Sequence, residues 1–254
     1  MAPQLHPRKA VHAPHPPLPH YYPDETVRQR WVRDIFDRTA PDYTRIEWLM
    51  GFGLGPRYRR DALRRAGLAP GMRFVDVGTG TGLVAREAIR ILGDARAVTG
   101  VDPSAGMLHE TLLPAGVTLL EGSAEALPLP AASADFLSMG YALRHISDLS
   151  LAFAEFLRVL APGGIVCILE ITRPVGRLGS AVLKTYLRTV VPALARVVAR
   201  TPDMPELMRY YWDTIQACVA PEEVMGALEN AGFAAVERHV EFGVFTEYRG
   251  RKPA

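Results

Sequence analysis

The sequence is poor in several features that mark whole classes of protein. Its 254 residues contain two cysteines, Cys167 and Cys218, which excludes a disulfide scaffold and suits a reducing compartment. Histidines, cysteines and carboxylates form no cluster at ligand spacing, so the sequence predicts no metal site. No apolar run reaches 18 residues and the N-terminus lacks an apolar core, so we expect neither a membrane-spanning helix nor a signal peptide.

An excess of charge of one sign is also missing. Lysine and arginine total 29 against 27 acidic residues, a net charge of +2, which indicates no nucleic-acid partner. The hydrophobic content is 48%, enough for a chain of this length to bury one sizeable core. We therefore expect a cytoplasmic protein, for which association with a membrane surface stays open.

Proline and histidine dominate residues 1–22, and this composition predicts a disordered tail ahead of one domain at residues 23–254. Residues 24–65 show helical spacing and many aromatic side chains, interrupted by a glycine-rich break. Helices in this place can cover a ligand bound to the sheet that follows. Tyr43 and Phe52 are therefore candidates for a substrate roof, with ordinary core packing as the alternative.

The most informative stretch is the run FVDVGTGTG at residues 74–82. Its apolar start predicts a buried parallel strand, its three glycines predict a tight turn, and residues 83–92 continue at helical spacing. Glycines let a ligand approach the backbone, and the free N–H groups at a helix start favour a carboxylate or phosphate. Asp102 ends the next predicted strand, where a carboxylate can accept hydrogen bonds from both hydroxyls of a ribose.

Two positions indicate which nucleotide this turn binds. The dinucleotide fingerprint needs glycine or alanine where this chain has Leu83, which argues against NAD. Asp76 is a buried carboxylate that must find a hydrogen-bond donor, and the amino group of a bound amino acid is one candidate. An acidic residue, three alternating glycines and the later Asp102 resemble motif I of the class I S-adenosylmethionine (SAM) methyltransferases. We therefore expect SAM as the cofactor.

The remaining pattern predicts an α/β fold, a Rossmann-like doubly wound sheet of seven strands with N-terminal helices. A helix is expected at 151–160 and further strands at 98–102, 116–120, 134–139 and 165–171. Two terminal strands, 232–237 and 240–247, lie too close for a helix between them, so the last strand should run antiparallel. A helical insertion at about 173–212 precedes the sixth strand and is expected to form a lid.

This insertion is rich in basic residues. Arg177, Lys184 and Arg188 fall on one helical stripe, with Arg196 and Arg200 on another beyond a proline. A basic amphipathic segment suits an anionic membrane surface. A solvated cationic face over the core is the alternative, and the sequence leaves both open.

Several stretches together resemble the ubiquinone/menaquinone-biosynthesis C-methyltransferase family. They are residues 43–52, the glycine run at 74–82, GYALRHISD at 140–148, RVLAPGG at 158–164 and EITRP at 170–174, within a likeness that runs from about 32 to 252. The resemblance implies a SAM-dependent methyltransferase. The implied methyl acceptor is an aromatic or quinol-type small molecule, with or without a prenyl chain, methylated on carbon.

The motifs and the resemblance together define a set of expected site residues. Those expected to hold SAM are Asp76, Gly78, Gly80, Thr81, Gly82, Asp102, Met107, Ser123, Ala124 and Gly140. By the resemblance, Met107 would pack on the adenine, with core packing as the alternative. Those expected to face the methyl acceptor are Tyr43, Phe52, Tyr141 and Tyr211.

The chain departs from the family at positions that bear on the acceptor. Where the family usually has tyrosine followed by aspartate, this chain has Tyr43 followed by threonine. Where the family has arginine followed by asparagine, this chain has Arg144 followed by His145. The residue that contacts the adenine is acidic or an amide in the family and is Ser123 here. Arginine stays protonated, so we expect Arg144 to stabilise a phenolate-like oxygen. His145 titrates near neutrality and is the candidate general base, directly or through water. The alternative for His145 is a loop histidine bonded to backbone.

The sequence leaves two other functions open. The first keeps SAM but methylates an oxygen or nitrogen of a lipid or secondary metabolite. The second is a non-catalytic SAM-fold protein that steadies an enzyme complex, and the intact glycine turn with Asp76 and Asp102 argues against it. The chain could act alone or as a homodimer.

Overall fold

The computed structural model describes residues 13–174 and 176–254. In this part of the chain seven strands form one sheet in the order β3-β2-β1-β4-β5-β7-β6. The strands are β1 (Phe74–Val77), β2 (Val98–Asp102), β3 (Thr118–Glu121), β4 (Ala134–Gly140), β5 (Leu160–Ile171), β6 (Ala234–Glu241) and β7 (Phe245–Arg251). Neighbours pair parallel from β3 to β5, while β7 runs antiparallel to both β5 and β6. The predicted seven-stranded α/β sheet with an antiparallel last strand is confirmed.

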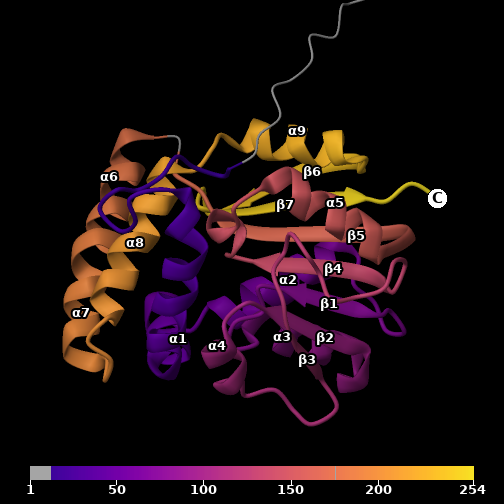
Figure 1. The fold of residues 1–254 in the computed structure, drawn as a ribbon, viewed down its shortest axis with the longest axis horizontal. Helices are drawn as coiled ribbons and strands as arrows, with labels where there is room; N and C mark the ends of the chain where they lie inside the picture. Colours follow the sequence, from indigo (N-terminus) through magenta and orange to yellow (C-terminus); the bar gives the residue numbers. More distant parts are fainter. Residues whose placement is uncertain (1–12, 175) are drawn as a thin grey trace, which may run out of the picture.

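Helices cover both faces of the sheet, which is why the central strands are apolar without alternation. All four residues of β1 are buried. Against one face pack α2 (Gly55–Ala66) and α3 (Leu83–Leu92), and against the other pack α5 (Leu149–Val159) and α9 (Pro221–Ala231), each pair with its own buried cluster (Figure 1). Shorter helices occupy the loops, namely η1 (Ala95–Ala97), α4 (Ala105–His109) and η2 (Leu143–His145).

A third cluster of buried side chains lies outside the sheet. It joins α1 (Glu25–Met50) to the insertion, which folds as α6 (Arg177–Thr185), the π-helical turn η3 (Tyr186–Val190), α7 (Val191–Val198) and α8 (Met204–Ala217). Figure 1 shows α1, α6, α7 and α8 gathered at one side of the sheet. Of the helices in the described ranges, none combines the length and the apolar character that crossing a membrane requires.

The terminal hairpin differs from its predicted bounds. The sequence predicted strands at 232–237 and 240–247, whereas both observed strands begin and end later. The reason is the position of the turn. Phe242 and Gly243 have φ of +53° and +68°, and Glu241 pairs with Phe245 across them. A turn that contains Gly243 moves the second strand towards the C-terminus.

The N-terminal segment is a second difference. Of the tail predicted at residues 1–22, residues 1–12 lie outside the described residues. Residues 13–22, which we call the N-terminal strap, pack on the domain, and the prediction of a disordered tail is wrong for them. His15 is 1% exposed and Tyr22 is 1% exposed. Composition could not reveal this packing, because the partners of the strap lie on distant parts of the chain.

Candidate active site

Two cavities lie at the edge of the sheet where the parallel strands end. The first has a volume of about 590 Å³, and we call it the Asp102 cavity. Its lining includes Asp102, Ser104, Met107, Ser123, Ala124 and His145. The second has a volume of about 630 Å³, and we call it the aromatic cavity. Its aromatic lining residues are Tyr43, Phe52, Tyr58, Tyr141, Tyr186, Tyr211, Phe242 and Phe245.

The two cavities share one wall at the turn between β1 and α3. The residues that line both are Tyr43, Gly78, Gly80, Gly140, Tyr141 and Tyr211. They come from α1, the glycine turn, the end of β4 and α8. Two ligands, one in each cavity, would therefore meet at the glycine turn.

The glycine turn has a backbone that favours glycine. Gly78, Gly80 and Gly82 have φ of +66°, +55° and +83°. A Cβ on Gly80 would meet nothing within 4 Å, so this position leaves room for a ligand beside the backbone. A Cβ on Gly82 would lie 2.6 Å from Leu113 Cγ, and Gly82 lines neither cavity. The structure thus places Gly82 at the start of α3 as a packing residue.

Asp102 ends β2 with its carboxylate in the first cavity. Its Oδ2 accepts a hydrogen bond from the backbone N–H of Gly80 at 2.7 Å, and its Oδ1 accepts one from Ser104 at 2.8 Å. Burial raises the pKa of Asp102 to about 6. Each carboxylate oxygen can accept a second hydrogen bond, so Asp102 can still bind the hydroxyl groups of a ligand.

Asp76 is oriented into the protein instead. Its Oδ1 accepts from the Ser138 hydroxyl at 2.6 Å and its Oδ2 from the Thr79 hydroxyl at 2.9 Å. It lines neither cavity, and burial raises its pKa to about 6. The expectation that a ligand amino group satisfies Asp76 is therefore contradicted, because its carboxylate faces neither cavity and its donors are Ser138 and Thr79. Asp76 holds the shape of the glycine turn through Thr79.

The other expected cofactor residues divide between the cavities. Met107, Ser123 and Ala124 line the Asp102 cavity, and Gly140 lines both. Thr81 lines the aromatic cavity. The Thr81 hydroxyl accepts a hydrogen bond from the hydroxyl of Thr44 in α1 at 2.8 Å.

Sequence reasoning missed Asp37, which α1 contributes to this region. Its Oδ1 accepts from the Ser104 hydroxyl at 2.5 Å and from the backbone N–H of Gly106 at 2.9 Å. These bonds tie α1 to the loop after β2. An aspartate in an amphipathic helix carries no signal of its own when its partner lies 67 residues away.

Two expected acceptor residues meet across the aromatic cavity. The hydroxyls of Tyr43 and Tyr211 lie 2.5 Å apart, which joins α1 to α8. Burial raises the pKa of both tyrosines, so both are neutral near pH 7. Phe52 is 76% exposed and stacks on Tyr186, with ring centroids 6.0 Å apart, which places it at the rim of this cavity.

Tyr141 has an unusual backbone for a large residue, with φ of +61°. The Arg59 guanidinium lies 5.3 Å from its ring centroid, and Arg59 forms an ion pair with Glu47 of α1. Burial raises the pKa of Tyr141. Sequence reasoning missed Arg59 and Glu47, because an arginine within a basic run normally indicates a solvated face.

Arg144 lies in the protein interior. Its side chain is 0% exposed, its Nε donates to Glu170 at 2.8 Å, and its Nη1 donates to the Thr214 hydroxyl at 2.7 Å. Its guanidinium lies 5.2 Å from the Tyr211 ring centroid, and it lines neither cavity. This arrangement contradicts the expectation that Arg144 stabilises a substrate oxygen, because its donors are used within the protein. Arg144 joins the loop after β4 to α8.

His145, the next residue, lines the Asp102 cavity. Its Nδ1 lies 3.3 Å from the Tyr210 hydroxyl, and its ring packs against Phe36 with centroids 5.2 Å apart. Its Nε2 is buried and has no hydrogen-bond partner in the described part of the chain. Burial and then the charge of Arg144 hold the pKa of His145 well below 6.5, so the imidazole is neutral. The partner of Nδ1 is a side chain, which contradicts the alternative of a backbone-bonded loop histidine.

The N-terminal strap reaches the backbone of this same loop. The Nε2 of His15 lies 3.0 Å from the carbonyl oxygen of Arg144. The Arg28 Nη2 of α1 donates to that carbonyl and to the Nε2 of His15, at 2.9 Å each. Burial and the Arg28 charge lower the pKa of His15 to about 4. The strap therefore packs on the loop that carries His145.

One group of possible metal ligands comes together within the described ranges. His239, Glu241 and Glu247 offer ligand atoms within 4.8 Å of one another. The Arg65 Nη2 already donates to Glu241 and to Glu247, at 2.6 Å each. A guanidinium thus holds the position that a cation would need.

Comparison with known proteins shows which family the chain is similar to. The model of the ubiE/COQ5 methyltransferase family matches residues 24–252. The ubiquinone/menaquinone biosynthesis C-methyltransferase UbiE of Syntrophotalea carbinolica is 36% identical over 225 residues, which covers 86% of this chain and 93% of that protein. The UbiE protein of Geobacter sulfurreducens is 31% identical and covers 89% of this chain and 90% of its own length.

Solved structures show the same fold. A SAM-dependent methyltransferase of Thermotoga maritima aligns with a TM-score of 0.61 at 24% identity, covering 87% of this chain and 99% of that chain. Phosphoethanolamine N-methyltransferase 2 of Haemonchus contortus, in complex with SAM, aligns with a TM-score of 0.61 at 20% identity and covers 87% of this chain and 60% of that chain.

The residues of the Asp102 cavity fit SAM. Asp102 presents a buried carboxylate that can accept further hydrogen bonds, and Gly80 leaves space beside the backbone. The chain belongs to the ubiE/COQ5 methyltransferase family and is a class I SAM-dependent methyltransferase.

Proposed function

We propose that this enzyme transfers the methyl group of SAM to a ring carbon of an aromatic or quinol-type acceptor in quinone biosynthesis. The observation that carries the proposal is the wall shared by the Asp102 cavity and the aromatic cavity. It brings a polar site with a ribose-binding carboxylate into contact with a site lined by aromatic rings. The names of the curated relatives support the same chemistry.

In this proposal the Asp102 cavity holds SAM, whose sulfonium supplies the methyl group. Asp102 accepts hydrogen bonds from the ribose hydroxyls. The adenine is contacted by Met107, Ser123 and Ala124, and the backbone at Gly78, Gly80, Thr81 and Gly140 borders the methionine part. Asp76 and Gly82 act indirectly, by shaping the turn.

The aromatic cavity holds the acceptor ring. Tyr43, Tyr141 and Tyr211 surround the ring beside the glycine turn, and Phe52 covers the entrance. Methyl transfer is an in-line displacement, so much of the acceleration comes from alignment. Alignment in a site that excludes water contributes up to roughly 7–11 kcal/mol.

His145 is the proposed general base. Burial keeps its imidazole neutral at pH 7, and its Nε2 has no partner among the described residues. Because His145 lines the Asp102 cavity and not the aromatic cavity, it would take a proton from the acceptor hydroxyl or from the ring carbon through a water molecule. Arg144 has a positioning role in place of the oxyanion role, because it holds the loop that carries His145.

Incubation with methyl-labelled SAM and a panel of demethylated quinol precursors tests this function. NMR of the product locates the new methyl group. A methyl group on a ring carbon is the expected result. A methyl group on oxygen or nitrogen would favour the O- or N-methyltransferase alternative, and a failure to bind SAM by calorimetry would favour a non-catalytic partner protein.

We also propose that the entrance of the aromatic cavity contacts a membrane surface, where a prenylated acceptor would reside. Leu178 and Val182 of α6 are 80% and 62% exposed, and they precede Tyr186, on which Phe52 stacks. Basic residues of the same helices add positive charge. Glutamine in place of Lys184, Arg188, Arg196 and Arg200 should reduce binding to anionic vesicles. Unaltered partitioning would discard the proposal.

A homodimer is the remaining partner expectation. Light scattering of the purified chain, with and without SAM, measures the mass in solution. A mass near twice the 27.9 kDa of one chain would support the dimer.

A further inference from the structure

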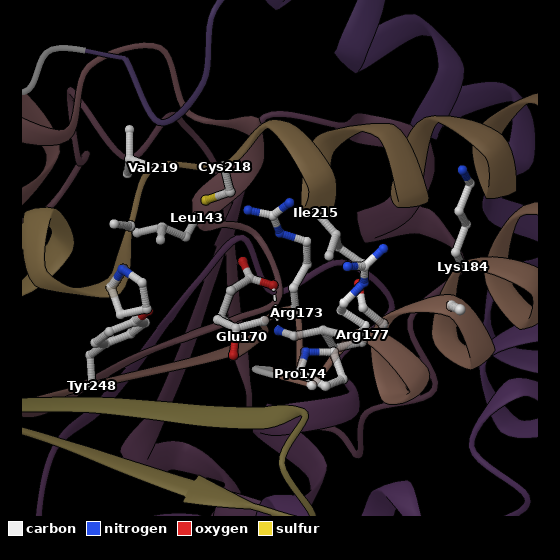
Figure 2. A pocket seen from close by; sticks show the side chains of 17 residues that line it. Leu143, Glu170, Arg173, Pro174, Arg177, Lys184, Ile215, Cys218, Val219 and Tyr248 are labelled. Atoms are coloured by element: carbon white, nitrogen blue, oxygen red, sulfur yellow. Dashed lines mark hydrogen bonds between the residues drawn. The ribbon is translucent and has the colours of Figure 1, made fainter.

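A third cavity, of about 740 Å³, has no part in the proposed methyl transfer. It lies between the end of β5, the start of α6 and the junction of α8 with α9 (Figure 2). Ile171 and Ile215 line both this cavity and the aromatic cavity, so the two are neighbours. We call it the basic cavity after three of its lining residues, Arg173, Arg177 and Lys184.

The basic cavity carries positive charge that is not neutralised. Arg173, Arg177 and Lys184 are exposed, and their side chains form no ion pair or hydrogen bond with any other described residue. Glu170 is the one acidic residue among its described lining residues, and Arg144 already pairs with it at 2.8 Å. A concave surface with three free cations attracts anions.

The start of α6 adds to this attraction. Gly176 precedes the helix, lines the cavity and supplies no side-chain cap. A Cβ on Gly176 would meet nothing within 4 Å, so there is space beside the backbone at the residue before the helix. The positive end of a helix dipole favours a phosphate, and Ser180 in the first turn offers a hydroxyl to it.

An unpartnered oxygen indicates what else the ligand carries. Glu170 is 1% exposed, and its Oε1 accepts from Arg144 Nε and from the backbone N–H of Ile171, each at 2.8 Å. Its Oε2 is buried and has no partner in the described part of the chain. A buried carboxylate oxygen needs a donor, which a simple phosphate near neutral pH supplies poorly and a hydroxyl group supplies well. Figure 2 shows Glu170 beside Arg173 in the middle of the cavity.

We infer that the basic cavity binds a phosphorylated polyol of the glycerol phosphate type. Arg173, Arg177 and the start of α6 hold its phosphate, with Lys184 farther along the helix, and one of its hydroxyls donates to Glu170 Oε2. The same chemical group exists as a free metabolite and as the head group of phosphatidylglycerol.

Calorimetric titration of the full chain with glycerol 3-phosphate tests the phosphate contacts. We expect saturable binding at low ionic strength. The double variant Arg173→Gln/Arg177→Gln should bind at least about tenfold more weakly, because charge-assisted hydrogen bonds to phosphate are among the stronger ones. Arg64→Gln changes an exposed arginine of α2 outside the cavity, and this matched control should bind as the wild type does.

Propyl phosphate, which has the phosphate and carbon chain without the hydroxyls, tests the contact with Glu170. On the unaltered protein it should bind several-fold more weakly than glycerol 3-phosphate. In Glu170→Gln that preference should disappear while phosphate binding persists, since the amide places a donor where the acceptor was. Thermal unfolding verifies the fold of each variant. Equal affinity of the wild type for both compounds would overturn the role of Glu170.

Vesicles of phosphatidylglycerol and of phosphatidylcholine separate the two sources of the ligand. Loss of phosphatidylglycerol binding in Arg173→Gln/Arg177→Gln but not in Arg64→Gln assigns the lipid head group, and binding of free glycerol 3-phosphate alone assigns the metabolite. No saturable binding of glycerol 3-phosphate together with equal vesicle binding by both variants would overturn the inference. Methyl transfer to a water-soluble quinol is measured separately, so a failure here is distinct from a failure of the proposed function.

Discussion

The two cavities at the glycine turn are built in different ways. The Asp102 cavity is formed mainly by the ends of adjacent strands and the short loops that follow them. The aromatic cavity takes its walls from α1, η3, α8 and the turn between β6 and β7, which lie far apart in the chain. Strand ends are positioned by the sheet itself, whereas helices of the cover are positioned by their packing. The shape of the Asp102 cavity therefore depends mainly on the sheet, and the shape of the aromatic cavity depends on the packing of the helices that cover it.

The largest effect is expected at His145, on the border of the Asp102 cavity. His145→Asn should lower kcat by about 10²–10⁴-fold and leave SAM affinity nearly unchanged, because a general base acts in the chemical step. Since burial holds the pKa of His145 well below 6.5, the wild-type kcat should begin to fall only below pH 6.5. Rates across pH for both proteins check this, and equal rates would remove the base assignment.

The second largest effect is a loss of stability, and we expect it at Arg144. Arg144→Met should destabilise the fold by about 3–5 kcal/mol, because Glu170 would remain buried without a partner. Urea unfolding measures this loss. The double variant Arg144→Met/Glu170→Met should recover part of the stability. A variant with full stability and no activity would restore the oxyanion role of Arg144.

Asp102→Ala tests whether the two cavities act independently. SAM affinity should fall about 100-fold, since two charge-assisted hydrogen bonds to the ribose are lost. The KM for the acceptor should stay close to the wild-type value, because Asp102 lines only the first cavity. Calorimetry and steady-state kinetics measure the two quantities. Asp94→Ala, at an exposed position before η1, is the control.

The N-terminal strap predicts a dependence of stability on pH. The pKa of His15 is about 4 in the folded protein and 6.5 in the unfolded chain. The unfolded state therefore binds more protons between these values, and the free energy of unfolding should decrease by up to about 3 kcal/mol as pH falls from 6.5 to 4. Urea unfolding at several pH values measures the slope. His15→Gln should flatten it, whereas His20→Gln, an exposed strap residue, should not.

The smallest predicted effect lies in the aromatic cavity. Tyr43→Phe removes one of two hydroxyls that lie 2.5 Å apart and leaves Tyr211 without that partner. The loss of about 1 kcal/mol should raise the acceptor KM about fivefold without changing SAM affinity. A change in SAM affinity of the same size would mean that the shared wall couples the two sites.

Arg144 and His145 are adjacent in the sequence, but their side chains lie in different surroundings. The sequence predicts that Arg144 and His145 lie in one loop and act on the same substrate. The 3₁₀ turn η2 buries the side chain of Arg144 in the protein and leaves His145 on the Asp102 cavity. The order of residues along a loop does not reveal which side chain enters the core, because that depends on partners such as Glu170 and Thr214.

By itself the sequence determined the sheet, the glycine turn and the position of Asp102. These features follow from local patterns, because an apolar run, a glycine turn and a helix are specified within about twenty residues. Only the tertiary structure decided that Asp76 faces Ser138, that the strap packs on the active-site loop, and that three cavities adjoin. These outcomes depend on contacts between distant segments, and a side chain's partner across the fold leaves no pattern in the sequence around it.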